Sequence, residues 1–359
     1  MWDFVASSDR AIQFALYSSL VAGVMTMLLF VWVVILRVRL LAQERRRKAF
    51  IEQWRPLLTR IALAPDAASE DDEGQPLPEL PKASLMNFLN EWNVLHDILR
   101  GSAGLRLNAL ARRMEIDKAA WTLLNHGRLS DQLIAIATLG HLGEVGAWDR
   151  LLELLHSEHT LISLMAAKAL INIDADRAIP LVLPLVTQRE DWAAARVSSL
   201  LQEAGPAATS KPLQQAILDG TPEEAARLIG FLPTVHRSIA GKVVHEMLQR
   251  SVDDRVTAVC LRVADSPLEL PQVRHLVNHP RWHIRMRAAT VLGRIGYRQD
   301  KRLLERLLCD TEWWVRYRAA QALTGLPFMD KKELNRIRKR LDDRFGRDMM
   351  DQVIAERAA

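Results

Sequence analysis

Three histidines four residues apart are the first candidates for chemistry. His275, His279 and His283 would share one face of a continuous helix, as zinc ligands on a helix do. Pro280 interrupts that helix, and the run from 275 to 283 contains no carboxylate. We therefore assign these histidines to the surface or to helix ends. The sequence shows no glycine-rich phosphate loop and no nucleophile–base arrangement, so we expect no metal, no cofactor and no catalytic residue.

Paired arginines could bind anions. Arg285 precedes Arg287 by two residues, and Arg316 precedes Arg318 in the same way. A guanidinium presents a planar set of donors that fits carboxylate and phosphate groups. We expect Arg287, Arg294 and Arg318 to contact a partner.

Tryptophans recur close to these arginines. Trp192, Trp282, Trp313 and Trp314 could form a ligand site, but large aromatic rings also fill the gaps between packed helices. We favour the packing interpretation.

The last part of the chain is basic. Residues 281–359 contain nineteen Lys and Arg against eleven Asp and Glu, a net charge of +8. We expect partner contacts at Lys331, Lys332, Arg336 and Arg340, which belong to a predicted helix over 331–345. A basic face can meet phosphate, lipid headgroups or an acidic protein.

The elements that position these residues begin with an apolar segment. Residues 11–36 carry no charge and would span about 39 Å as a helix, more than the roughly 30 Å of a bilayer core. A cleaved signal peptide is the rival interpretation, but the run is too long and its start is acidic. We predict a retained membrane helix. Its small residues Ala15, Ser19 and Gly23 recur every four positions, which favours close packing with another helix or a homodimer.

Positive charge follows the apolar run and predicts its orientation. Residues 37–60 have a net charge of +6, so the long C-terminal part is expected in the cytoplasm and the N-terminus outside. Two cysteines, Cys260 and Cys309, agree with a reducing compartment. We predict a single pass through a bacterial inner membrane. The cations expected to set topology or bind lipid are Arg37, Arg39, Arg45, Arg46, Arg47 and Lys48.

Composition divides the chain into five parts. Residues 1–64 hold the anchor and a basic juxtamembrane helix, and 65–82 form an acidic, proline-rich linker that cannot bury a core. We expect that linker to set the reach of the body from the bilayer. Residues 83–128 are predicted to form a helical cap, 129–328 a repeat array, and 329–359 basic capping helices.

Self-similarity defines the array. Trp282 to Leu292 and Trp313 to Leu323 share Trp, two Arg, Ala-Ala and Leu at a spacing of 31. The same register continues backwards less perfectly, and an apolar residue ends each copy. These positions are 139, 170, 201, 229, 261, 292 and 323. Each copy contains two short apolar segments with helical periodicity, and such hairpins need neighbours to bury their apolar faces.

The run from Asp310 to Leu323 resembles a HEAT repeat of the short type found in phycobilisome lyases. The resemblance implies an all-α fold, an α-solenoid of about seven helical hairpins after one transmembrane helix. In such repeats the Asp and the Arg after Val commonly bridge neighbours, which implies a structural role for Arg316. The HEAT-built deoxyhypusine hydroxylases bind iron through several His-Glu dipeptides. This chain has one, His245-Glu246, so an iron enzyme is not expected.

The function expected from these features is a non-enzymatic membrane scaffold that binds a protein partner. The chain also resembles uncharacterised bacterial HEAT proteins found near glycosyltransferases, which implies a role in exopolysaccharide or envelope assembly. Two alternatives remain open at this stage: a lyase-type enzyme or subunit for a pigment or cofactor, and a nucleic-acid-binding protein. The membrane anchor disfavours nucleic acid as a partner.

Overall fold

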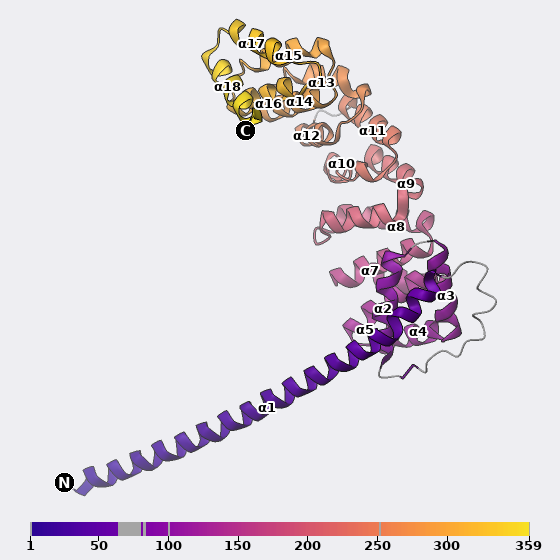
Figure 1. Ribbon diagram of the computed structural model, residues 1–359, viewed down its shortest axis with the longest axis vertical. Helices are drawn as coiled ribbons and strands as arrows, with labels where there is room; N and C mark the ends of the chain where they lie inside the picture. The colour runs from indigo at the N-terminus through magenta and orange to yellow at the C-terminus, as the bar shows by residue number, and fades with distance from the viewer. Residues whose placement is uncertain (1, 64–79, 82–83, 100, 251–252, 359) are drawn as a thin grey trace. The chain divides into compact units, whose positions relative to one another are not determined.

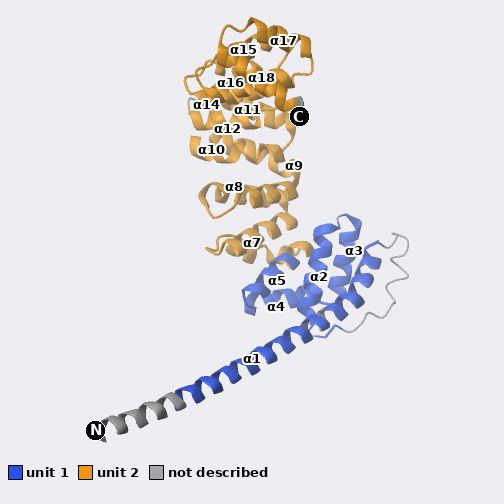
Figure 2. Ribbon diagram, turned by 60° about the vertical axis from the view of Figure 1, so that its left-hand side comes forward, with its two compact units in different colours: residues 1–138 blue, residues 139–359 orange. Residues whose placement is uncertain are grey.

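The described part of the chain is helical wherever it has regular structure (Figure 1). This computed structural model describes residues 2–63, 80–81, 84–99, 101–250 and 253–358, and their side chains outside 2–16, 43, 46, 47 and 358. Contacts divide the chain into two compact units, Met1–Thr138 and Leu139–Ala359 (Figure 2). The predicted boundaries of the five parts are not tested by this division and stay predictions.

A single helix, α1 (Trp2–Leu63), contains both the predicted anchor and the predicted juxtamembrane helix. Its segment Tyr17–Ala42 is apolar, with a mean hydropathy of 2.6, and is long enough to cross a membrane. Every side chain from 17 to 42 is exposed. Pro56 lies inside the helix without ending it.

The last turns of α1 pack into unit 1. Phe50, Trp54, Leu58 and Ala62 recur every four residues and are buried against α2 (Leu85–Ile98) and α3 (Ser102–Arg113). Arg106 of α3 then closes the end of α1, because its Nε and Nη2 donate to the carbonyl oxygen of Ala62 at 3.1 and 2.6 Å. The helix that carries the apolar segment is therefore part of the folded unit.

This packing corrects the role expected for the acidic linker. Residues 64–79 and 82–83 lie outside the described residues, but the helices on either side of them, α1 and α2, pack together. The linker thus joins two elements of one unit, and α1 itself sets the distance between the apolar segment and that unit.

His96 of α2 gives unit 1 a dependence on pH. Its ring lies against Trp92, with 4.2 Å between the ring centroids. Burial lowers the pKa of His96 from 6.5 to about 4, against the opposing effects of Asn108 and Asp97. The folded protein therefore keeps the imidazole neutral at pH values where the unfolded chain binds a proton.

We predict that protonation linked to His96 lowers the free energy of unfolding by about 2–3 kcal/mol as the pH falls from 7 to 4. Urea unfolding of the wild type and of His96→Gln at several pH values measures this effect. The variant should lose that part of the pH dependence. If the free energy of unfolding changed equally with pH in the wild type and in His96→Gln, the prediction would be contradicted.

Unit 2 stacks helical hairpins one after another, as Figure 1 shows from α7 to α16. All seven apolar positions that the sequence spacing selected, from Leu139 to Leu323, are buried. This confirms the HEAT-like α-solenoid. The first helices of the hairpins in unit 2 are α7 (Thr160–Ile173), the first part of α9 (Ala194–Asp219), α10 (Pro222–Ile229), α12 (Asp254–Val263), α14 (Trp282–Ile295) and α16 (Trp313–Gly325). The array begins with α5 (Leu129–Leu142), of which only the residues from Leu139 onward belong to unit 2. The second helices are α6 (Trp148–Leu155), α8 (Ala175–Gln188), the rest of α9, α11 (Arg237–Arg250), α13 (Leu270–Leu276) and α15 (Lys301–Leu307).

The interval from Leu201 to Ile229 is shorter than the others in the array, and it has a local cause. Residues 189–193 connect α8 to α9, whereas only Gly220 and Thr221 connect α9 to α10. Thr221 makes this sharp connection possible because it forms a capping box with Glu224 ahead of Pro222. The shorter loop accounts for the shorter interval.

Gly205 forms the turn between the two helices of the third hairpin. Its φ of +81° is a conformation that residues with a side chain rarely adopt, and it bends α9 in the middle. Gly293 has a different role, because a Cβ there would lie 2.6 Å from the Cβ of Ala322. The glycine lets α14 and α16 approach closely.

Two further helices complete the C-terminal end. The basic helix α17 (Lys331–Arg340) buries only Leu334 and Ile337, and α18 (Arg344–Ala358) packs on α16. Four short 3₁₀ turns precede helices of the array or follow α10: η4 (Val145–Ala147), η5 (Leu232–Thr234), η6 (Pro267–Glu269) and η7 (Arg298–Asp300).

Candidate partner-binding surface

A buried ion pair fixes the last two repeats together. Arg285 of α14 donates through Nε and Nη2 to the two carboxylate oxygens of Asp310, each at 2.7 Å. Its Nη1 also donates to the carbonyls of His279 and Pro280, at 2.9 and 3.0 Å. Burial alone would raise the pKa of Asp310, but the hydrogen bonds from Arg285 and from the backbone of Glu312 outweigh it and hold that pKa below its usual value. The arginine after the buried apolar residue is thus structural in this repeat.

Arg316 has the same place one repeat later but a different partner. Its Nη1 donates to the carbonyl oxygens of Asp310 and Thr311, at 2.6 and 3.1 Å. One repeat length after Asp310 the chain has Leu341, so the next acidic partner is missing. Arg316 therefore holds its own loop, and its guanidinium lies over the Phe345 ring of α18, 5.4 Å from the ring centroid, instead of meeting a carboxylate of the described residues.

Exposed aromatic side chains gather at the start of α14 and α16. Trp282, Trp313 and Trp314 are 39%, 41% and 50% exposed. Trp313 stacks on Tyr317 with centroids 5.0 Å apart and meets Trp314 edge-on at 4.7 Å. We call Trp282, Trp313, Trp314, Tyr317 and the exposed Phe345 the aromatic rim.

The packing interpretation of the tryptophans is therefore confirmed at one position and wrong at three. Trp192 is 1% exposed, and Arg189 lies over its ring. The other three lie in the first turns of their helices, ahead of the residues that enter the core, Ile284 and Val315. Their positions in the helix leave a large part of each indole in solvent.

Two of the predicted contact arginines, Arg294 and Arg318, form hydrogen bonds within the repeats. The exposed Arg294 donates through Nη2 to the carbonyl of Ala264, at the end of α12. Arg318 is half-buried and donates to Gln321 Oε1 at 2.7 Å. Arg287 is also half-buried, and its Nε is buried with no hydrogen-bond partner among the described residues. Contact of these three arginines with a partner stays a prediction.

The four predicted residues of α17 are exposed together. Lys331, Lys332, Arg336 and Arg340 lie on a helix that begins at Asp330, whose carboxylate accepts from the backbone of Glu333 at 2.6 Å. Arg336 pairs with Glu333 at 3.0 Å. The remaining cations leave this helix strongly basic.

Arg340 also borders a hollow that the sequence analysis missed. The hollow has a volume of about 550 Å³ and is lined by Arg298, Gln299, Lys301, Arg302, Glu305 and Arg340. Glu305 lies 3.8 Å from both Lys301 and Arg340, so a single carboxylate faces four cations in the lining. The charge of the C-terminal part was visible in the sequence, but its concentration here depends on how α15 and α17 pack. We call this feature the basic hollow.

The histidine run has a carboxylate neighbour, which comes from another helix. His279 lies 3.4 Å from Asp254, a carboxylate supplied by α12, and its Nδ1 accepts from the backbone N–H of Arg281. Across the described residues, no three His, Cys, Asp or Glu side chains are grouped as metal ligands. His245 is within hydrogen-bond distance of Leu268 and Gln249, and Glu246 pairs with Arg250.

The predicted residues of the membrane segment are only partly described. Arg37, Arg39, Arg45 and Lys48 are exposed on α1, whereas the side chains of Arg46, Arg47 and Ala15 lie outside the described residues. Ser19 is exposed, and a Cβ at Gly23 would meet nothing within 4 Å among the described atoms. Packing of this face against another helix stays a prediction.

Comparison with known proteins agrees with the repeat geometry. Residues 241–324, from α11 to α16, match HEAT repeats. HEAT repeats indicate a helical-repeat scaffold for protein interaction. The likeness to the phycobilisome-lyase type stays a prediction, and no curated protein matches the chain.

Two solved structures are similar over most of their length. Human deoxyhypusine hydroxylase in complex with glycerol covers 77% of this chain and 97% of its own, with 16% identity and a TM-score of 0.28. YibA of Escherichia coli covers 78% of this chain and 99% of its own, with 14% identity and a TM-score of 0.36.

Proposed function

We propose that this protein is a membrane-anchored, non-enzymatic scaffold whose last repeats bind a partner protein. The observation that carries the proposal is the aromatic rim, in which three tryptophans are 39–50% exposed. Tryptophan, tyrosine and arginine dominate the energetically important centres of protein interfaces. The basic hollow adds a preference for a partner with an acidic surface, because charge complementarity steers association.

The apolar segment supports the membrane anchor. Tyr17–Ala42 exposes 26 consecutive, mostly apolar residues with none of that segment buried. Exposed apolar surface of that extent marks contact with a membrane or another protein. The cations that follow it favour a cytoplasmic C-terminal part in a bacterial inner membrane.

Confinement to the membrane supplies the mechanism of the scaffold. A partner held on the last repeats gains a high effective concentration toward other membrane components without any new contact. The helical stretch between Ala42 and Phe50 spans only about 10 Å, so unit 1 is held close to the bilayer surface. A role in exopolysaccharide or envelope assembly stays a prediction from the resemblance.

Replacement of Trp313 and Trp314 together by alanine tests the partner surface. We expect the amount of partner that co-purifies with the full-length protein in mild detergent to fall at least about ten-fold, since each indole is a candidate anchor of the interface. A photo-cross-linking residue at position 313 should capture the same partner. Tyr297→Ala is the matched control, because Tyr297 is 53% exposed outside the rim.

Equal recovery of the partner with the double variant and with Tyr297→Ala would refute the rim as its binding surface.

Carbonate washing of membranes and the intact mass of the purified chain test the anchor in the same preparation. A chain that has lost residues 1–36, or that leaves the membrane on washing, would refute the anchor.

A further inference from the structure

Two consecutive repeats place a buried carboxylate at the same position. Glu269 Oε2 accepts from the backbone N–H of Ser266 at 3.1 Å, and Asp300 Oδ2 accepts from that of Tyr297 at 2.7 Å. One pair lies at η6 and the other one repeat later at η7, and in each the carboxylate accepts from the backbone three residues before it. Each carboxylate-bearing residue is only 1% exposed.

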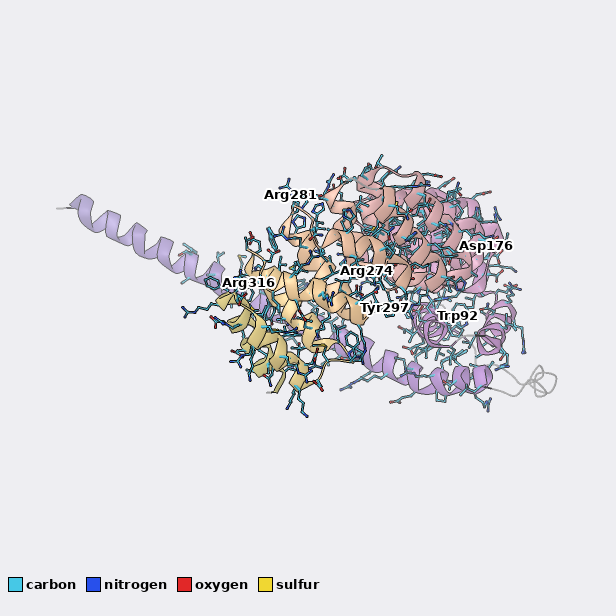
Figure 3. The ribbon with its side chains drawn as sticks, turned by 90° about the horizontal axis from the view of Figure 1, so that it is seen from above. Trp92, Asp176, Arg274, Arg281, Tyr297 and Arg316 are labelled. Atoms are coloured by element: carbon cyan, nitrogen blue, oxygen red, sulfur yellow. The ribbon has the colours of Figure 1, made fainter. Side chains whose placement is uncertain are left out.

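The two carboxylates differ in their cationic partner. Arg274 of α13 donates to Asp300 through Nε at 2.6 Å and through Nη2 at 3.0 Å, and Arg274 and Tyr297 lie together in Figure 3. One repeat before Arg274, the equivalent position is Val243, which is fully buried. Among the described residues, no cation forms an ion pair with Glu269. One repeat thus supplies a guanidinium to its buried carboxylate, and the preceding repeat supplies none.

A cavity lies beside Glu269, the carboxylate without a cationic partner among the described residues. About 280 Å³ of space lies beside Glu269, lined also by Gly241, Val244, Ser266 and Asp265. Gly241 is the equivalent of Gln272 in the next repeat, and a Cβ added at Gly241 would lie 3.9 Å from Glu269 Oε1. The absence of a side chain at this position therefore leaves the carboxylate within reach of the cavity.

The mouth of the cavity already holds one ion pair. Arg237 lines the cavity, but its Nη2 lies 2.9 Å from Asp265 Oδ1 and also donates to the Asp265 carbonyl at 3.2 Å. Its side chain is 78% exposed, so it remains at the surface. Arg294 of α14 is the other nearby cation, and its Nη2 is bonded to the carbonyl of Ala264.

We propose that the cavity beside Glu269 binds a guanidinium group supplied from outside the chain, in the manner in which Asp300 binds Arg274. A planar guanidinium can donate two parallel hydrogen bonds to a carboxylate, which is the arrangement the next repeat displays. The group comes either from an arginine of a bound protein or from a free small molecule. The first source rests on the scaffold function proposed above, whereas the chemistry of the cavity does not.

Binding of this kind depends on pH. Burial raises the pKa of Glu269 to about 7, although backbone N–H groups of Ser266 and Asp265 oppose the effect. Asp265 raises this pKa further and Arg294 lowers it. The thiol of Cys260 on α12 faces the same group and stays protonated, since its own pKa is raised to about 12 by burial. On α11, the His245 ring is within hydrogen-bond distance of the Leu268 carbonyl, and Arg237 lies at the opening of the cavity. A guanidinium needs the ionised carboxylate, so its affinity should increase from pH 6 to pH 8.

Saturation-transfer NMR on the full-length protein in detergent micelles tests the proposal. The probes are N-acetyl-arginine amide and its neutral isostere N-acetyl-citrulline amide. We expect binding of the arginine amide alone, with affinity that rises from pH 6 to pH 8. Glu269→Gln should weaken it at least about ten-fold, as expected for loss of a charged hydrogen-bond pair. Glu246→Gln, which changes a carboxylate of α11 that is paired with Arg250, should leave it unchanged.

Free L-arginine identifies the source of the group. Stronger binding of the amide indicates a side chain of a protein partner, and stronger binding of free arginine indicates a small molecule. Equal binding of the citrulline amide, or no binding of either arginine probe at tens of millimolar, would overturn the proposal. If Glu269→Gln unfolds, the pH dependence of the wild type decides, and a flat profile between pH 6 and 8 refutes the carboxylate. None of these results depends on whether the aromatic rim captures its partner.

Discussion

Replacing Arg285 by alanine is expected to lower the free energy of unfolding of unit 2 by about 3–5 kcal/mol. The substitution removes the only described cation that pairs with Asp310, whose side chain is 8% exposed. It also removes the donors to the carbonyls of His279 and Pro280. A buried carboxylate without its partner costs far more than an exposed one, because water cannot solvate it. Thermal and urea unfolding of the full-length protein, followed by circular dichroism, measures the loss.

Arg316→Ala is the matched control for this prediction. Arg316 makes the same pair of bonds to loop carbonyls but neutralises no carboxylate of a following repeat. Its loss should cost about 1–2 kcal/mol. In the double variant Arg285→Ala/Asp310→Ala, part of the loss should be regained, since no charge is left buried. Equal effects of Arg285→Ala and Arg316→Ala would contradict the prediction.

The stabilisation that the Arg285–Asp310 ion pair gives to the folded state depends on pH. The pKa of Asp310 is held below its usual value of 3.8, so the pair stabilises the folded state above that pH. The stabilisation disappears as the pH falls below 3.8 and the carboxylate is protonated. The difference between the wild type and Arg285→Ala should therefore narrow in acid.

The repeat array was predictable because its signal is local and repeated. Ala288-Ala289 and Ala319-Ala320 are fully buried, which explains why small residues recur where neighbouring helices meet. The apolar position that ends each copy is buried in all seven copies, including the irregular ones at Ile229 and Leu261. Most copies keep the spacing of 31 residues although their other residues differ, because each hairpin must bury the same face against its neighbours.

The surfaces were less predictable because exposure depends on several helices at once. Periodicity places Trp282 and Trp313 at corners of the repeat, but it does not say whether a neighbour covers them. The basic hollow combines residues of η7, α15 and α17, and Glu269 is distinctive only because Val243 stands where the next repeat has Arg274. The difference between Val243 and Arg274 is visible in the sequence, but only the structure shows the cavity beside Glu269.

The role predicted for the acidic linker was wrong for a similar reason. Composition sets residues 65–82 apart from their neighbours in the sequence, yet it carries no information on where the preceding helix packs. Phe50, Trp54 and Leu58 form an apolar stripe on α1, and such a stripe needs a partner surface. The partner surface is formed by α2 and α3, which follow the linker in the sequence. The stripe, and not the linker, therefore determines how the helix with the apolar segment is joined to α2 and α3.

Replacing Trp54 by alanine should release the last turns of α1 from α2 and α3. Trp54 is 1% exposed, stacks on Phe50 with centroids 5.7 Å apart, and meets Phe88 of α2 edge-on at 5.2 Å. Removing a buried indole of this kind costs about 3–5 kcal/mol. We expect faster hydrogen exchange in α2 and α3, and proteolysis of α1 between Phe50 and Leu63, while the helix over Tyr17–Ala42 is unaffected.

Trp32→Ala is the control, because Trp32 belongs to the apolar segment and is 61% exposed. It should leave exchange in α2 and α3 unchanged. Lengthening the linker with glycine and serine should also leave the separation between α1 and α2 unchanged in the wild type, as measured by spin labels placed on exposed residues of the two helices. The same insertion in Trp54→Ala should increase that separation, since the linker becomes the remaining connection only when the packed stripe is lost. A linker insertion that moves the helices apart in the wild type would show that the stripe does not hold them, and anchoring would then act through a flexible tether.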